Sequence, residues 1–139
     1  MIRRSISRLT IVSLIFIVAA CDRGYEDCHD SMYLENRSGS TIYYLSTLKE
    51  GFMNYDPSNP TYSADYRIAA GENRKIRIGI TLSCWEQVLS NAGGYLYIYI
   101  FDAERVDSEG WNNVKETPLK RYKLSANQLK ETGWQVSYP

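Results

Sequence analysis

The 139-residue chain has little of what most enzyme active sites use. It contains one histidine, His29, and only three cysteines. It has no G-x-S-x-G motif, no phosphate-binding glycine loop and no cluster with metal-ligand spacing. Asp102 and Glu104 could in principle do acid–base work, but two acids at a strand end are typical of a solvated surface. We therefore expect no enzyme, no cofactor and no metal.

Long hydrophobic runs are also absent, except near the N-terminus. The first ten residues carry three Arg and no acid, and residues 11–20 are apolar apart from Ser13. A membrane-spanning helix needs roughly 20 apolar residues, so this run is too short to span. Its basic start and apolar core are typical of an export signal over residues 1–20.

The end of this signal is more specific. Val18-Ala19-Ala20-Cys21 resembles the bacterial lipobox, in which small residues precede an obligatory cysteine. In proteins with this motif the cysteine sulfur receives a diacylglycerol and the preceding peptide bond is cut. The resemblance implies that Cys21 is the lipidated first residue of a protein anchored on a membrane that it does not span. The alternative is an ordinary cleaved signal with a chance cysteine, which this register disfavours.

Removal of the signal changes the charge balance. The whole chain has 16 Lys and Arg against 16 Asp and Glu, and the chain from residue 21 onward keeps 13 against 16, a net charge of −3. A nucleic-acid binder is expected to carry a basic surface instead. We therefore expect no nucleic-acid partner.

The two remaining cysteines are expected to pair. Export places Cys28 and Cys84 in an oxidising compartment, and a bridge between these residues, 56 positions apart, would stabilise the fold by about 4 kcal/mol. The neighbours of Cys28 are His29, Asp27 and Asp30, which raises a metal site as an alternative, but adjacent residues seldom point at one ion. A nucleophile and base pair of Cys28 with His29 is disfavoured for the same reason.

Residues 21–30 are rich in charge and predict a tether, and residues 31–139 predict one domain. Strand patterns recur through this domain, at 32–36, 41–45, 66–69, 74–82, 95–102, 119–123 and 134–138. The first two, joined by a turn-like spacer, predict a hairpin. Residues 49–65 predict a long loop.

Short helices are expected in the connections. Capping-box patterns at 83–86 and 125–128 predict two helix starts, ended by the glycines at 93–94 and by Gly133, and 108–117 predicts a helical turn. Short connections favour antiparallel pairing. We expect a mainly β fold, an antiparallel β-sandwich of immunoglobulin or transthyretin type with two or three short helices. The alternative is one antiparallel sheet with helices on one face.

Several short motifs together are similar to a known group. The lipobox, Ile100-Phe101-Asp102, Trp111, the run LKRYKL at 119–124 and a terminal WxxxYP resemble small lipoproteins of unknown function from Bacteroidales-type gut bacteria. The resemblance implies an outer-membrane setting and carries over no catalytic residue. In such bacteria an acidic patch after the lipidated cysteine can direct export to the cell surface. Glu26-Asp27 is a weak version of that patch, so the surface and the periplasmic face both stay open.

The same resemblance singles out Ser31. Asp30-Ser31-Met32 fits the pattern at which these bacteria attach O-glycans to exported proteins. Two interpretations stay open, a sugar on Ser31 or an unmodified serine at the start of the first strand.

Aromatic side chains are the main binding candidates. In Tyr95-Leu-Tyr-Ile-Tyr-Ile-Phe101 the aromatic and aliphatic residues alternate between two faces, and we interpret the run as a central strand covered on both sides. Phe52, Tyr55 and Tyr62 in the long loop are the better candidates for a binding surface.

Two functions follow from different classes. The first is a cell-envelope binding or accessory module for a glycan or a protein. The alternative is an immunity-type or inhibitor protein that blocks a toxin or a hydrolase.

Overall fold

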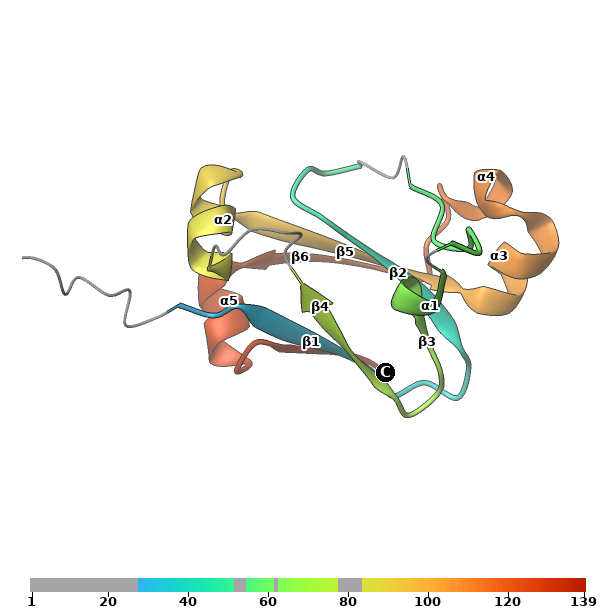
Figure 1. Cartoon of the computed structure of the whole chain (residues 1–139), viewed down its shortest axis with the longest axis horizontal. Coiled ribbons are helices and arrows are strands. Elements are labelled where there is room, and N and C mark those ends of the chain that lie inside the picture. Colours follow the sequence, from blue (N-terminus) through green and yellow to red (C-terminus); the bar gives the residue numbers. More distant parts are fainter. Residues whose placement is uncertain (1–27, 52–54, 62, 78–83) are drawn as a thin grey trace, which may run out of the picture.

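The structure, a computed structural model, describes residues 28–51, 55–61, 63–77 and 84–139 (Figure 1). In chain order its elements are β1 (Ser31–Asn36), β2 (Ile42–Thr47), α1 (Ser63–Tyr66), β3 (Arg67–Ile68), β4 (Asn73–Arg77), α2 (Trp85–Asn91), β5 (Tyr95–Asp102), α3 (Ala103–Glu109), α4 (Trp111–Val114), β6 (Lys120–Ser125), α5 (Ala126–Glu131) and β7 (Gln135–Tyr138). Each predicted strand has a counterpart among these seven. The end of the run predicted at 74–82 lies outside the described residues.

The strands form two sheets. The small sheet has the order β4-β1-β7 and the large sheet the order β3-β2-β5-β6. The predicted hairpin is wrong, because β1 pairs with β4 and β7 while β2 pairs with β3 and β5. The spacer after β1 carries the chain from one sheet to the other. Pairing in the described part is antiparallel except between β1 and β7, which run parallel. Its helices number five, where two or three were expected.

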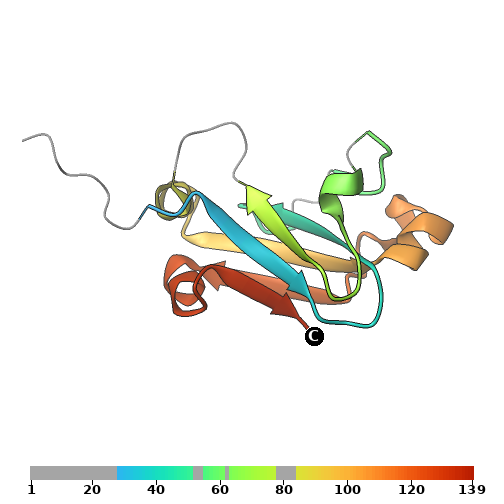
Figure 2. The same ribbon diagram turned by 60° about the horizontal axis from the view of Figure 1, so that its bottom comes forward.

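One hydrophobic core is shared by the two sheets. The small sheet contributes buried side chains such as Leu34 and Ile76, and the large sheet contributes Ile98 and Ile100. Each of these lies on one face of its strand, as the alternation predicts. In the turned view of Figure 2, β1 and β4 pass across β2 and β5. Residues of α2 and α5 belong to the same core, and both helices lie near the start of β1, on the left of Figure 1.

A second core covers the other face of the large sheet. Tyr99 and Phe101 of β5 pack there against α3 and α4, and the Phe101 and Trp111 rings meet edge to face at 4.8 Å. The central-strand interpretation of β5 is thus confirmed for this half of the strand. At its other end Tyr95 is 41% exposed. The two helices are separated at Gly110, whose φ of 83° favours glycine.

Asn36 is a fully buried polar residue that links the two sheets. Its side-chain amide donates to the carbonyl oxygens of Ser40, Ile68 and Ala69 at 2.7, 3.1 and 3.1 Å. Its Oδ1 accepts from the amide and the hydroxyl of Ser38. Because Asn36 ends β1 and Ile68 belongs to β3, these bonds join the small sheet to the large one.

The two predicted capping boxes have different outcomes. At α5 the box is confirmed, since Ser125 accepts from the Gln128 amide and the Gln128 side chain accepts from the Ser125 amide. At α2 the predicted N-cap is wrong, because the helix has Cys84 as its N-cap, with no side-chain cap bond. Glu86 instead accepts from the main chain of His29 at 3.1 Å. This contact is long-range, whereas the predicted one was local, and Ser83, the predicted cap, lies outside the described residues.

Candidate functional site

A disulfide and two side-chain contacts hold the N-terminal segment at Cys28 and His29 against the rest of the domain. The predicted disulfide between Cys28 and Cys84 is present, with the Cα atoms 5.0 Å apart. Next to it, His29 Nδ1 lies 2.6 Å from Glu86 Oε1, and the His29 ring stacks on Trp134 with ring centroids 4.7 Å apart. We call these five residues the N-terminal clamp. The clamp holds residues 28–29, part of the segment expected to be a tether, against α2 and the start of β7.

The clamp has its own electrostatics. Partial burial raises the pKa of Glu86, but the hydrogen bonds from the His29 ring and main chain outweigh it, so the pKa lies below its ordinary value. With Cys28 in the disulfide and His29 bonded to Glu86, the clamp uses both residues structurally. Across the described ranges, no three His, Cys, Asp or Glu side chains are grouped so that they could hold a metal ion.

The long-loop aromatics can be placed only in part, because Phe52 and Tyr62 lie outside the described residues. Tyr55 is 40% exposed, and its ring meets that of Tyr66 edge to face at 5.3 Å. Tyr66 in turn lies 5.6 Å from the buried Tyr44 of β2. The three rings form a continuous aromatic row from the loop into the molecule.

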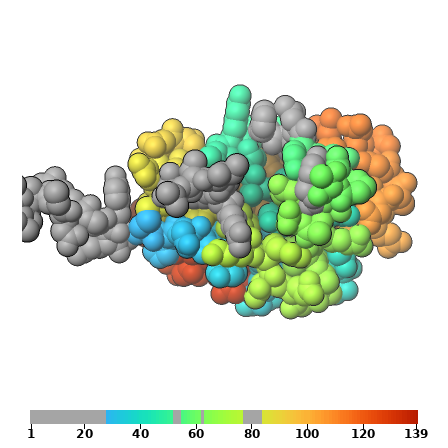
Figure 3. Space-filling view, viewed as in Figure 1, coloured from blue at the N-terminus to red at the C-terminus, as the bar shows by residue number. Residues whose placement is uncertain are grey.

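This row ends at a groove of about 600 Å³ between β2 of the large sheet, α1 and β4, an edge strand of the small sheet. We call it the inter-sheet groove, and it is lined by Tyr44, Ser46, Asp65, Tyr66, Asn73, Arg74, Lys75 and Ile76. Figure 3 shows β4 and the α1 region, in yellow-green and green, together on one face of the molecule. Sequence reasoning found Tyr55 through loop composition but missed the lining residues. No local signal marks them, since they come together from β2, α1 and β4.

Hydrogen bonds fix the walls of the groove. The Tyr44 hydroxyl donates to the Asp65 carbonyl at 3.1 Å, and Arg74 Nη2 donates to the Arg67 carbonyl at 2.9 Å. Burial raises the pKa of the Tyr44 hydroxyl far above its ordinary value, so it remains a neutral donor. The groove therefore combines aromatic surface with amide, carboxylate and cationic groups from separate elements.

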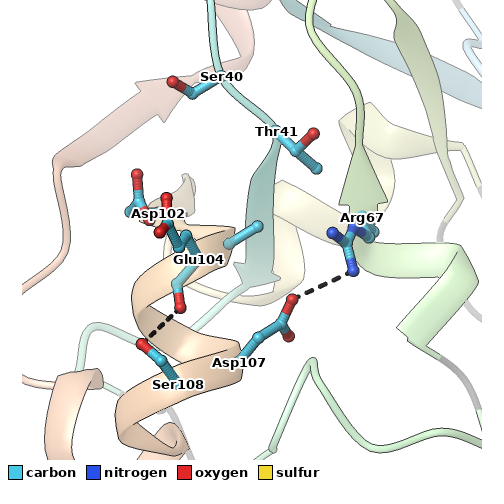
Figure 4. A pocket seen from close by; sticks show the side chains of 8 residues that line it. Ser40, Thr41, Arg67, Asp102, Glu104, Asp107 and Ser108 are labelled. Atoms are coloured by element: carbon cyan, nitrogen blue, oxygen red, sulfur yellow. Dashed lines mark hydrogen bonds and ion pairs between the residues drawn. The ribbon is translucent and has the colours of Figure 1, made fainter.

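A second hollow, of about 570 Å³, lies at the start of α3 and contains the predicted acid pair (Figure 4). The Asp102 carboxylate accepts from the Arg105 amide at 2.8 Å and so caps α3. Asp107 accepts from the Tyr43 hydroxyl at 3.0 Å and pairs with Arg67 at 3.2 Å. Asp102 and Asp107 thus have structural roles at this helix, and the hollow has no aromatic residue in its lining.

The remaining sequence candidates concern the chain's attachment and modification. Ser31 begins β1 and its hydroxyl donates to the Asp30 carboxylate at 2.9 Å, in an exposed position. Cys21 lies outside the described residues. None of the helices that the structure describes has the length and apolar character needed to cross a bilayer.

The fold and the grooves define a mainly β protein of two sheets with a disulfide beside its N-terminal segment. In comparisons with known proteins, no family model, no curated protein and no solved structure matches the chain. Its function is therefore inferred from its own residues.

Proposed function

We propose that this protein is a lipid-anchored binding module of the cell envelope, with a β-sandwich domain that binds a glycan in the inter-sheet groove. The observation that carries the proposal is the row of Tyr55, Tyr66 and Tyr44 leading into a groove lined by polar side chains. Enzymatic activity is not part of the proposal.

A glycan suits the chemistry of this groove. Tyrosine rings offer flat apolar surface for the C–H faces of sugars, together with a polar tip. Asp65 accepts hydrogen bonds, Lys75 donates them and Asn73 does both, which matches hydroxyl groups that donate and accept. The groove's volume of about 600 Å³ falls within the range of about 300–1,000 Å³ typical of ligand pockets.

The setting of the module rests on its N-terminal sequence. The signal over residues 1–20 and the lipobox ending at Cys21 support an acylated anchor, and the resemblance supports the outer membrane. The Cys28–Cys84 bridge suits an oxidising compartment. The core shared by both sheets supports the β-sandwich class.

The test uses the full-length chain in detergent on an array of bacterial and plant polysaccharides. We expect binding to at least one polysaccharide and a loss of about tenfold or more in the Phe52→Ala, Tyr55→Ala, Tyr62→Ala triple variant. Tyr95→Ala is the matched control, because Tyr95 is 41% exposed, against 40% for Tyr55, and lies on β5, outside the groove lining.

Two results would reject the glycan. One is the absence of polysaccharide binding by the intact protein. The other is equal affinity of the triple variant, with its unfolding midpoint unchanged. Retention of a single envelope or effector protein from intact cells, without any glycan, would favour the immunity-type alternative.

A further inference from the structure

A third hollow lies on the outer face of the large sheet, beyond the part that α3 and α4 cover. Along β5 the outward-facing tyrosines become more exposed away from these helices. Tyr99 is 4% exposed, Tyr97 is partly buried and Tyr95 is 41% exposed. The aromatic face of the central strand is thus uncovered at one end.

A pocket of about 190 Å³ is built on this face. We call it the Tyr97 pocket, and it is lined by Glu50, Gly51, Tyr97, Tyr99, Glu116, Arg121, Tyr122 and Lys123. The Tyr99 hydroxyl accepts from the Gly51 amide at 2.8 Å. This bond holds the start of the long loop against the sheet, so that one wall of the pocket is fixed.

Four charged side chains surround the pocket, and they are not paired with one another. Glu50 and Glu116 are exposed carboxylates, and Arg121 and Lys123 are exposed cations on β6. None of the four takes part in an ion pair within the described ranges. Arg121 donates to the Glu116 carbonyl oxygen, at 3.2 Å, and leaves the carboxylate available.

Lys123 also covers the aromatic surface. Its ammonium lies 4.6 Å from the Tyr95 ring centroid and 5.7 Å from that of Tyr97. Lysine has a flexible four-carbon stem and three rotatable donors, so the ammonium can turn towards a ligand in the pocket. Tyr97 then presents apolar surface at the floor.

We propose that the Tyr97 pocket binds one neutral sugar ring. Two carboxylates would repel an anion and two cations would repel a cation, whereas sugar hydroxyls both accept from Arg121 or Lys123 and donate to Glu50 or Glu116. The volume is below the roughly 300 Å³ of typical ligand pockets, which fits a single ring better than a chain. This proposal is independent of the inter-sheet groove, because the groove is lined by β2, α1 and β4 and the Tyr97 pocket mainly by β5 and β6.

The test is saturation-transfer NMR on the full-length chain in detergent, with the methyl glycosides of glucose, galactose, mannose and N-acetylglucosamine as probes. We expect transfer to at least one of them. Glu116→Gln and Lys123→Gln should each weaken its binding about tenfold, because each loses a hydrogen bond to a charged group. The matched controls are Glu104→Gln on α3 and Lys120→Gln, one of the exposed cations of β6 outside the pocket lining.

Three outcomes would overturn the proposal. The first is no transfer from any of the four glycosides. The second is unchanged affinity in both Glu116→Gln and Lys123→Gln. The third is binding of methyl glucuronide alone, which would mean an anionic ligand. Tyr55→Ala separates the two sites, since it should weaken polysaccharide binding at the groove and leave binding of the methyl glycoside unchanged.

Discussion

Replacement of Asn36 by Ala should cost this domain about 3 kcal/mol of unfolding free energy. The side chain is fully buried and makes five hydrogen bonds. The Ser40 carbonyl also accepts from the Ser38 hydroxyl, and the Ala69 carbonyl from the Glu72 amide, so both keep a donor. The Ile68 carbonyl and the Ser38 amide lose the Asn36 partner. Two such groups at about 1.5 kcal/mol each give about 3 kcal/mol.

Urea unfolding followed by tryptophan fluorescence measures this loss. Asn36→Asp should be less stable than Asn36→Ala at neutral pH, since it turns a carboxylate towards three carbonyl oxygens. Ser38→Ala, the control, removes a hydroxyl that is only partly buried and should cost about 1 kcal/mol or less. An Asn36→Ala variant within about 0.5 kcal/mol of the wild type would refute the reasoning that these bonds hold the sheets together.

Three further predictions concern the N-terminal region. Replacing Cys28 and Cys84 by Ser should lower the unfolding free energy by about 4 kcal/mol in urea titration, and a loss below about 1 kcal/mol would contradict the loop-entropy argument. The pKa of Glu86 is lowered in the folded state, so its stabilising effect is present above its ordinary pKa and is lost as the pH falls through the folded pKa. Stability should therefore fall less between about pH 5 and pH 3 in Glu86→Gln than in the wild type, and equal slopes would show that the contact to His29 does not stabilise the fold. Intact mass of protein from the native host should show loss of residues 1–20, acyl mass on Cys21 and two alkylatable thiols only after reduction, whereas three free thiols would reject both the anchor and the bridge.

The positions of the strands could be predicted, but not their partners. The alternation in β5 and the β-rich runs of β1, β2 and β6 place each strand within a few residues, because side-chain period is a local property. Pairing depends on contacts between distant segments. The spacer at 37–40 reads as a hairpin turn, yet Asn36 is bonded across to the segment around Ile68, and the chain changes sheets there.

The same division applies to the helix starts. The box at α5 is self-contained, and both of its hydrogen bonds join residues three apart. At α2 the Glu86 carboxylate instead bonds to His29, 57 positions earlier in the chain, through the main-chain amide and a ring nitrogen of that residue. A local pattern gives no information about such a partner.

The candidate sites depended most on the tertiary structure. Tyr55 stood out in the sequence because an aromatic residue in a polar loop is a binding signal by itself. Tyr44 and Lys75 carry no such signal, because each lies within a strand pattern that predicts only secondary structure. They line one groove only because β2 of the large sheet lies near β4, an edge strand of the small sheet.

The sequence by itself determined the positions of the strands, the cap of α5 and the pairing of Cys28 with Cys84, because each follows from residues close in the chain or from the small number of cysteines. The tertiary structure alone decided which strands share a sheet, that β7 runs parallel to β1, and where Tyr97 and Lys123 meet the start of the long loop. Those features arise from burial and from hydrogen bonds between segments tens of residues apart, which no local pattern encodes.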